Sequence, residues 1–233
     1  VYGWLLQYSF EHIDEIAGLE WLRLAGAAGL GLAAAALFGL LLRVGWHWPA
    51  AGFAAAMTVL APAAQIVAGW ATAWPYPVAA LLALGGFALA NANREDYPWL
   101  RRTGAVLLVT ASALIYQPNS LLYLVGIAAV LPVLRGQPPL ARLRWVGVHL
   151  VIVAAGLAVA FLIMKLSYVA GVFTASNRIA FEADPVGKLG WFLREPLLNA
   201  LNLLVLNDDG GATRTMYTVS AWITALLLAA GLG

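Results

Sequence analysis

The carboxylates that could act as bases stand in two polar stretches of this sequence, one early and one late. Glu11 and Asp14 precede the first long apolar run, and Asp208 opens the acidic turn 208–211. A carboxylate near lipid headgroups can act as a general base on a hydroxyl group. We therefore take Glu11, Asp14 and Asp208 as candidate catalytic residues. The alternative is that they belong to a solvated acidic surface.

A second group of side chains suits ligand binding. Tyr116, Gln117 and Asn119 lie around Pro118, between two apolar runs. They either line a cavity that opens outward or form a plain turn between helices, and we take all three as candidate substrate-binding residues. Arg178 joins them, because a guanidinium can bind a phosphate group through two parallel hydrogen bonds. The alternative for Arg178 is an ordinary surface arginine.

Several kinds of chemistry find no support in the sequence. The chain has no cysteine, which excludes disulfides, thiol catalysis and cysteine-bound metal. No metal site is predicted, because no second histidine or carboxylate stands at ligand spacing from His149. His149 itself either functions within the membrane or bonds a neighbouring helix. No Gly-rich phosphate loop, zinc helix or nucleophile elbow is present. No cofactor is indicated, the need for a divalent cation stays open, and no basic run points to nucleic acid.

The composition indicates that lipid surrounds much of this chain. The elements that position the polar stretches are therefore membrane helices. The chain of 233 residues is 63% hydrophobic and 10% charged, whereas soluble domains carry about 25% charged residues. A membrane helix needs about 20 apolar residues. The sequence therefore predicts an all-α, polytopic bundle of about seven membrane spans: 22–42, 49–73, 77–92, 103–116, 121–134, 146–164 and 216–233.

Three of these predictions depend on turn signals. Pro62 should kink the second span, and Trp74-Pro75-Tyr76-Pro77 is typical of an interfacial turn rich in aromatic side chains. The uncharged run 103–134 would be about 48 Å long as one helix, longer than the ~30 Å hydrocarbon core. We therefore divide it at 117–120, and a re-entrant hairpin is the alternative.

The basic residues predict the orientation of the spans. If the spans alternate, one set of arginines falls on a single side of the membrane: Arg43, Arg94, Arg101, Arg102, Arg135, Arg142 and Arg144. The positive-inside rule places that side in the cytoplasm. Segment 1–21 and loop 167–214 then lie outside the cytoplasm, together with most of the carboxylates.

The predicted organisation has three parts. Residues 1–166 hold six spans with short loops, 167–214 form an extracytoplasmic loop, and 215–233 begin a last, truncated span. Asp184 followed by Pro185 predicts a helix start, so we expect short interfacial helices in the loop. The alternative is an eighth span broken by Pro196. Because the chain starts with Val1 and stops inside an apolar run, we expect it to be a fragment of a longer protein.

Parts of residues 19–135 resemble the bacterial O-antigen glucosyl transferases of the Gtr type II kind, which are polytopic membrane glycosyltransferases of the GT-C sort. The run LEWLRL at 19–24, the second span with Pro62 and the run ALIYQP at 113–118 carry the resemblance. The acidic pair on an early outer loop of that family is not seen in this sequence.

The resemblance implies a transfer reaction at the outer face of the bacterial inner membrane. A sugar, glucose in that family, would move from a polyprenyl-phosphate donor to a cell-surface or lipid-linked glycan acceptor. The partners implied are therefore membrane lipid, the polyprenyl-phosphate sugar and the glycan, without nucleic acid. A polytopic transporter or flippase and a non-catalytic membrane assembly protein are the alternatives.

Overall fold

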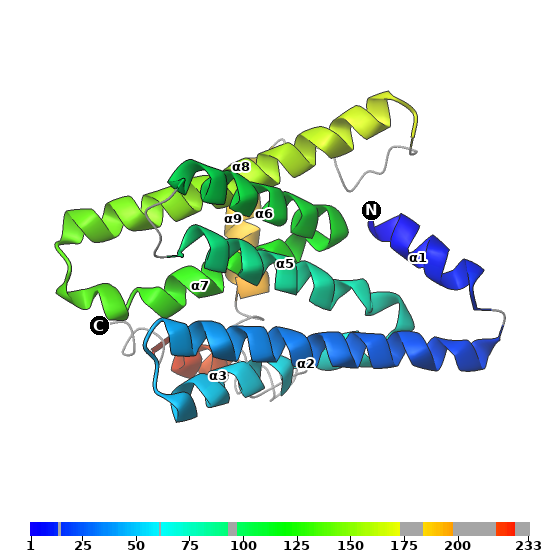
Figure 1. The fold of residues 1–233 in the computed structure, drawn as a ribbon, viewed down its shortest axis with the longest axis horizontal. Coiled ribbons are helices and arrows are strands. Elements are labelled where there is room, and N and C mark those ends of the chain that lie inside the picture. Colours follow the sequence, from blue (N-terminus) through cyan, green and yellow to red (C-terminus); the bar gives the residue numbers. More distant parts are fainter. Residues whose placement is uncertain (14, 61, 93–96, 173–183, 198–217, 227–233) are drawn as a thin grey trace. The chain divides into compact units, whose positions relative to one another are not determined.

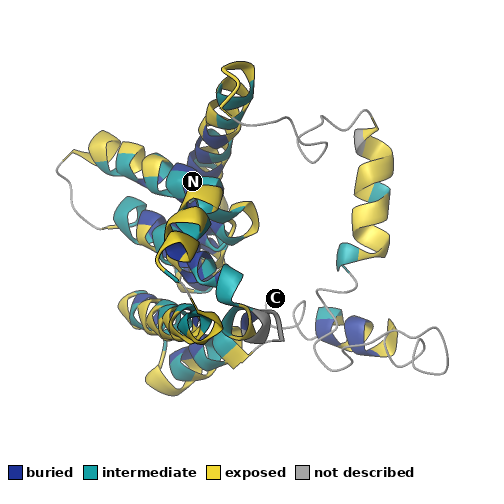
Figure 2. Ribbon diagram, turned by 90° about the vertical axis from the view of Figure 1, so that its right-hand side faces the viewer, coloured by how far each residue is buried: buried dark blue, intermediate teal, exposed yellow. Residues whose placement is uncertain are grey.

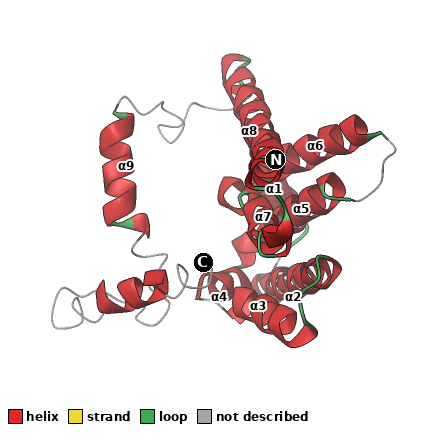
Figure 3. Cartoon of the chain, turned by 90° about the vertical axis from the view of Figure 1, so that its left-hand side faces the viewer, coloured by secondary structure: helices red, strands yellow, loops and turns green. Residues whose placement is uncertain are grey.

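A computed structural model describes residues 1–13, 15–60, 62–92, 97–172, 184–197 and 218–226 (Figure 1). These described residues contain helices and no strand, in agreement with the predicted all-α class (Figure 3). The chain divides into unit 1, Val1–Phe173, and unit 2, Thr174–Gly233. Each unit is described by itself.

Three helical segments among the described residues are long and apolar enough to cross a membrane: Ile16–Arg43, Ala71–Ala90 and Pro139–Val169. They contain α2 (Leu19–Arg43), α5 (Pro75–Ala90) and α8 (Pro139–Val169). Only 28% of the most apolar window of the α8 segment is buried within the protein, and Figure 2 shows the exposed faces of unit 1 in yellow. Such a surface needs lipid around it, so the chain is a membrane protein.

The second predicted span is divided into short helices. α3 ends at Leu60 and α4 begins at Pro62 (α3, Trp48–Leu60; α4, Pro62–Gly69). The break therefore falls where Pro62 removes a backbone donor, as expected. α3 has 13 residues and spans about 20 Å, less than the ~30 Å apolar core. Both helices pack against α2.

The turn expected at Trp74-Pro75-Tyr76-Pro77 is wrong. The short 3₁₀ helix η2 (Ala71–Ala73) leads into α5, and Pro75 to Pro77 form its first turn. The first N–H groups of a helix have no partner within the helix, so prolines lose nothing there. Pro75 and Pro77 are fully buried, which places this corner inside unit 1.

The division of run 103–134 is seen as a bend. α6 (Pro98–Ser120) contains the extended residue Tyr116 (φ −154°, ψ 104°), and α7 (Tyr123–Val130) is inclined to α6 by 71°. Asn119 contacts Tyr76 near the start of α5, whereas Ala129 at the end of α7 accepts a hydrogen bond from Trp46, beyond the end of α2. The chain therefore reverses its direction at residues 117–122. Both the two-span prediction and the re-entrant hairpin require such a reversal.

Contacts between helices fix their directions. Gly29 lies against Pro77, and Arg43 lines the same cleft as Ala88, so α2 and α5 run parallel. Ser112 contacts Ala79 while Asn119 contacts Tyr76, so α6 runs the opposite way to α5. α8 runs parallel to α6, since Arg144 and Arg102 line one cleft and Leu114 lines another with Ile163.

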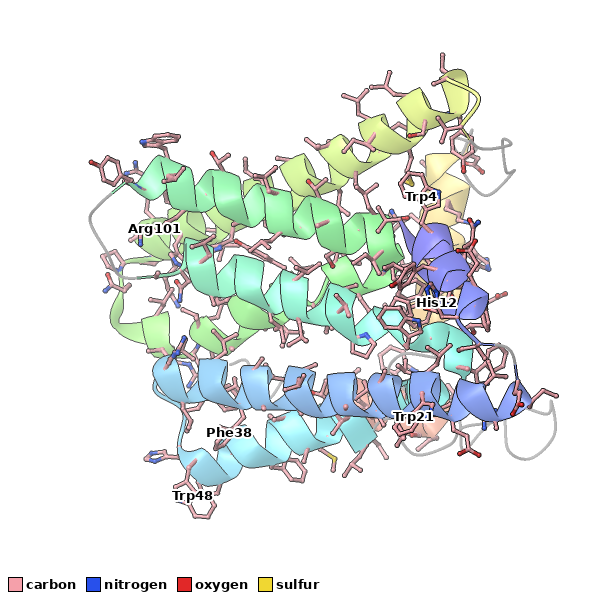
Figure 4. All side chains as sticks on the ribbon, turned by 45° about the vertical axis from the view of Figure 1, so that its right-hand side comes forward. Trp4, His12, Trp21, Phe38, Trp48 and Arg101 are labelled. Carbon is pink, nitrogen blue, oxygen red and sulfur yellow. The ribbon has the colours of Figure 1, made fainter. Side chains whose placement is uncertain are left out.

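These directions bring the described arginines of the orientation set to one end of unit 1, which we call the arginine end: Arg43, Arg101, Arg102, Arg135, Arg142 and Arg144. Arg94 lies outside the described residues. The opposite end carries α1 (Tyr2–Glu11), and we call it the α1 end. Figure 4 shows Arg101 at one end and His12 with Trp21 at the other.

Small residues allow the close helix contacts of the core. A Cβ on Gly156 of α8 would stand 2.6 Å from Cγ1 of Val109 on α6, and one on Gly126 would stand 2.3 Å from the ring of Phe87. Glycines at helix contacts are typical of membrane bundles, where backbones pack closely. Thr110 strengthens the contact between α6 and α8 by donating to the carbonyl of Gly156 at 3.1 Å.

Unit 2 contains the short helix expected in the loop. α9 (Pro185–Arg194) begins as predicted, with Asp184 accepting a hydrogen bond from the backbone N–H of Gly187 at 2.8 Å. Lys188 lies over the ring of Trp191, 4.2 Å from its centroid. Residues 218–226 are helical within the last predicted span, 216–233.

Candidate functional site

Helix α1 is held at its end of unit 1 by two hydrogen bonds from one of its faces. The Tyr2 hydroxyl donates to the Thr72 carbonyl at 2.9 Å, and Nε1 of Trp74 donates to the Ser9 hydroxyl at 3.2 Å. Tyr2 and Ser9 are two helical turns apart and therefore share a face. The contact positions the second half of α1 beside the start of α2.

A cleft of about 680 Å³ lies between α1, the 3₁₀ helix η1 (Ile16–Gly18) and the first turns of α2. Its polar and aromatic lining comes from Tyr8, His12, Glu15, Trp21 and Trp74. An apolar cleft with a few polar groups is the usual form of a small-molecule site. This cleft is therefore the candidate functional site, and we call it the α1 cleft.

His12 has a defined hydrogen-bonding arrangement. Its Nδ1 lies 2.8 Å from the Tyr8 carbonyl oxygen, and a carbonyl oxygen only accepts, so Nδ1 carries a proton. Nε2 of the neutral ring is then a proton acceptor. The Tyr8 ring also packs against the imidazole, with 4.5 Å between centroids. An imidazole and the Glu15 carboxylate thus line one cleft, which is a combination suited to proton transfer.

The candidate catalytic residues are placed differently. Glu11 is exposed at the end of α1, where Oε1 accepts a hydrogen bond from Nε2 of Gln7 at 2.9 Å. Glu15, four positions later, lines the α1 cleft, whereas Glu11 is outside its lining. Asp14 and Asp208 lie outside the described residues.

Two of the candidate substrate-binding residues pack between helices. The Tyr116 ring stacks on Tyr76, with centroids 3.8 Å apart and planes at 13°, and Nδ2 of Asn119 donates to the Tyr76 carbonyl at 2.8 Å. Tyr76 also packs against Tyr2, with 5.7 Å between centroids. Tyr116 and Asn119 therefore connect the end of α6 to α5 and, through Tyr76, to α1.

The other two candidates are not brought into this arrangement. The side chain of Gln117 is exposed, and its backbone carbonyl accepts a hydrogen bond from the Ser120 hydroxyl at 2.6 Å. Arg178 lies outside the described residues. The arrangement around 116–120 corresponds to the turn alternative more closely than to a cavity wall.

A second cleft at the α1 end, of about 430 Å³, lies between α1, α6 and α8. Its aromatic lining comes from Tyr2, Trp4 and Tyr168. Trp4 is 63% exposed, which is typical of an aromatic side chain at headgroup depth. Among the described residues that line this second cleft there is no carboxylate or imidazole side chain.

His149 is remote from the α1 cleft. It is buried in the arginine half of unit 1, where Nδ1 lies 2.8 Å from the Tyr123 hydroxyl of α7. Of the two alternatives for His149, the structure shows the bond to a neighbouring helix. In the part of the chain that the structure describes, no three His, Cys, Asp or Glu side chains gather as a metal site.

The sequence did not reveal the residues that hold α1 in place. Tyr2, Ser9, Thr72 and Trp74 make the contacts, but their pairing is long-range and leaves no local spacing signal. The recurrence of Tyr2 and Ser9 on one helical face is the one sign that a pattern search could have used.

Neither family models, nor curated proteins, nor solved structures match this chain. Its function is therefore argued from the α1 cleft and its surroundings.

Proposed function

We propose that the chain is a multi-pass membrane glycosyltransferase that moves a sugar, glucose, from a polyprenyl phosphate to a cell-surface or lipid-linked glycan. The observation that carries this proposal is the α1 cleft, which Glu15, His12, Trp21 and Trp74 line together at the end of unit 1 that carries α1. The resemblance to glucosyl transferases of the Gtr type II kind agrees with a transfer reaction at this end.

The proposal includes a topology. The arginine end faces the cytoplasm of a bacterial inner membrane, and the α1 end faces outward. Six arginines at one end of unit 1 support this orientation. Seven spans and an extracytoplasmic loop over 167–214 complete it, and the short helix α9, with Trp191 and Phe192 exposed, suits an interfacial position in that loop.

The proposed chemistry is a displacement at the anomeric carbon of the donor. The Glu15 carboxylate accepts the proton of the acceptor hydroxyl as its oxygen bonds to the anomeric carbon. The bond from that carbon to the phosphate oxygen breaks, and the electron pair leaves with the polyprenyl phosphate. A cation stabilises the departing charge; Arg178, the sequence-based candidate for phosphate binding, lies outside the described residues and is tested by substitution below.

The surroundings of the α1 cleft fit a lipid-linked donor. Trp21 is 73% exposed at the start of α2, so the cleft borders on the region where lipid tails and headgroups meet. An isoprenoid tail can remain in the bilayer while its phosphate and sugar reach the carboxylate. The indole rings of Trp21 and Trp74 give the sugar an apolar wall.

The test is sugar transfer in membranes that contain the full-length protein, with a radiolabelled polyprenyl-phosphate glucose as the donor. Glu15→Gln should slow transfer about 10²–10⁴-fold, which is the usual contribution of a general base. Glu20→Gln is the matched control, because Glu20 is exposed in the first turn of α2 and does not line the cleft. Glu11→Gln, Asp14→Asn, Asp208→Asn and Arg178→Gln test the other candidates. The proposal fails if the wild-type membranes transfer no sugar, or if every one of these variants transfers sugar normally.

One observation favours a transporter as the second candidate. His149 is 97% buried within a predicted span and bonded to Tyr123, and ionisable groups inside membranes often mark solute or proton paths. Proteoliposomes that take up a solute without transferring sugar would favour this reading.

A further inference from the structure

A cleft of about 500 Å³ lies between α6 and α8 at the arginine end. On α6 it is lined by Arg102, Thr103 and Val106. On α8 its lining repeats every three or four positions, and so forms one helical face: Arg144, Gly147, Val148, Val151, Ile152 and Ala155. We call it the α6–α8 groove.

The groove is cationic at one end and apolar along the rest. Arg102 and Arg144 stand at its mouth, and the α8 face from Arg144 to Ala155 extends for about 16 Å at 1.5 Å per residue. The close contact of Gly156 with Val109 closes the groove at its far end. A ligand that fills it must therefore be anionic at its head and apolar along its length.

Aromatic side chains indicate the depth of the groove's mouth. Tyr97 and Trp99, just before Arg102, are 67% and 64% exposed. Exposed Tyr and Trp at a helix end mark the headgroup layer of a membrane. The two guanidinium groups are then at the level of lipid phosphates, and the apolar stripe is at the level of acyl chains.

Among the described residues, the charges near the mouth of the groove are cationic, and Glu95 and Asp96, which precede α6, lie outside the described residues. In unit 1 the described carboxylates, Glu11, Glu15 and Glu20, all belong to the α1 end. Arg102 and Arg144 form no ion pair with any residue that the structure describes. Two guanidinium groups at one mouth bind a phosphate more strongly than isolated charges would.

We propose that the α6–α8 groove binds one phospholipid with an anionic headgroup. Arg102 and Arg144 hold its phosphate, the Thr103 hydroxyl donates a further hydrogen bond, and an acyl chain covers the α8 stripe. Basic pockets between membrane helices are the usual sites of anionic lipids. This site needs only that the chain spans a membrane, so it is independent of the proposed sugar transfer.

The test measures lipid binding to the purified full chain in a neutral detergent by native mass spectrometry. Phosphatidylglycerol is compared with phosphatidylcholine of the same acyl chains, and with glycerol 3-phosphate as a headgroup without chains. Phosphatidylglycerol should bind more tightly than phosphatidylcholine, and glycerol 3-phosphate should not displace it. Arg102→Gln and Arg144→Gln should each weaken phosphatidylglycerol binding about fivefold, and the double variant about 25-fold, from the typical effect of one arginine at an anionic membrane surface.

Two further variants keep the test decisive. Arg142→Gln is the matched control, because Arg142 is on the same turn of α8 but outside the lining of the groove. Gly147→Leu fills the groove while leaving both arginines in place, and a Cβ at Gly147 meets no atom within 4 Å. It should therefore abolish the preference for phosphatidylglycerol without unfolding the protein.

Three results would overturn the assignment. Equal binding of phosphatidylglycerol and phosphatidylcholine would remove the role of charge. Unchanged binding in Gly147→Leu would place the lipid elsewhere, even if the arginine variants failed to fold. A loss in Arg142→Gln as large as in Arg144→Gln would reduce the site to the general charge of the arginine end.

Discussion

Gly156 offers the most direct test of how α6 and α8 pack. Replacement by alanine adds one methyl group at a contact where the new Cβ would stand 2.6 Å from Cγ1 and 2.8 Å from Cβ of Val109, and 3.2 Å from the carbonyl oxygen of Val106. Distances below 3.0 Å are not tolerated by real Cβ atoms. Either α8 must move away from α6, or the Val109 side chain must leave its preferred rotamer.

The expected magnitude follows from the cost of overpacking. Inserting a methyl group into a filled core costs about 1–3 kcal/mol. Separation of the helices would also lengthen the hydrogen bond from Thr110 to the Gly156 carbonyl, but the same hydroxyl keeps the Val106 carbonyl at 2.9 Å, so this adds no further cost. For a chain of this size, 1 kcal/mol corresponds to about 2–4 °C in the melting temperature. We therefore expect Gly156→Ala to lower Tm by about 2–12 °C.

The assay is thermal unfolding of the purified protein in detergent, followed by circular dichroism and by loss of the monomer peak in size-exclusion chromatography. Gly147→Ala is the matched control on the same helix, since its Cβ would meet nothing within 4 Å. Its Tm should stay equal or rise slightly, because alanine favours helix over glycine. If Gly156→Ala melts at the same temperature as Gly147→Ala, Gly156 does not pack against Val109 as closely as the structure shows.

Two further predictions concern the buried polar pair and the sidedness of unit 1. Tyr123→Phe removes the hydrogen-bond partner of Nδ1 of His149 and leaves a buried polar atom unsatisfied, so the free energy of unfolding should fall by about 1–3 kcal/mol; an unchanged denaturation midpoint would contradict the bond. Because the chain has no cysteine, Glu11→Cys and Arg142→Cys give single labelling sites for a membrane-impermeant maleimide in intact cells and in inverted vesicles. The two positions should react from opposite sides, and reaction of both from one side would refute the proposed orientation.

The long apolar runs allowed much of the bundle to be predicted from sequence. The predicted span 22–42 is contained in α2, and 146–164 is contained in α8. Run length and composition decide such elements before any tertiary contact forms. The gathering of the arginines at one end was also predicted, because each alternation of spans returns the basic loops to the same side.

The sequence alone could not predict which helices pack against one another. α2 and α8 are apolar around most of their circumference, so no periodic face indicates a neighbour. The first turn of α5 was mistaken for a loop because Pro75 and Pro77 are turn residues elsewhere. Their fit at a helix start depends on η2 and α1, which lie against this corner.

The sequence indicated the acidic stretch before α2 as a candidate site, and the structure adds that Glu15 of this stretch lines the α1 cleft. The sequence-based candidates in it are Glu11, which is outside the lining of the cleft, and Asp14, which lies outside the described residues. Whether a carboxylate lines a cleft depends on where α1 ends and η1 begins, and the structure assigns that position to Glu15. A cap or break of one residue turns a side chain by about 100° about the helix axis, so composition alone cannot decide between the two.

The distribution of polar groups in unit 1 limits where chemistry can occur. Serine and threonine hydroxyls inside the bundle are satisfied by backbone carbonyls, as Ser112 is by Ala79 and Thr110 by Gly156, and such bonds leave no charge in lipid. Charged groups in the same position would be far more costly. Reactive or binding charges therefore concentrate at the two ends, with Glu15 in the α1 cleft and Arg102 in the α6–α8 groove. Because these ends open to opposite sides of the apolar core, a change in one site should leave the other intact.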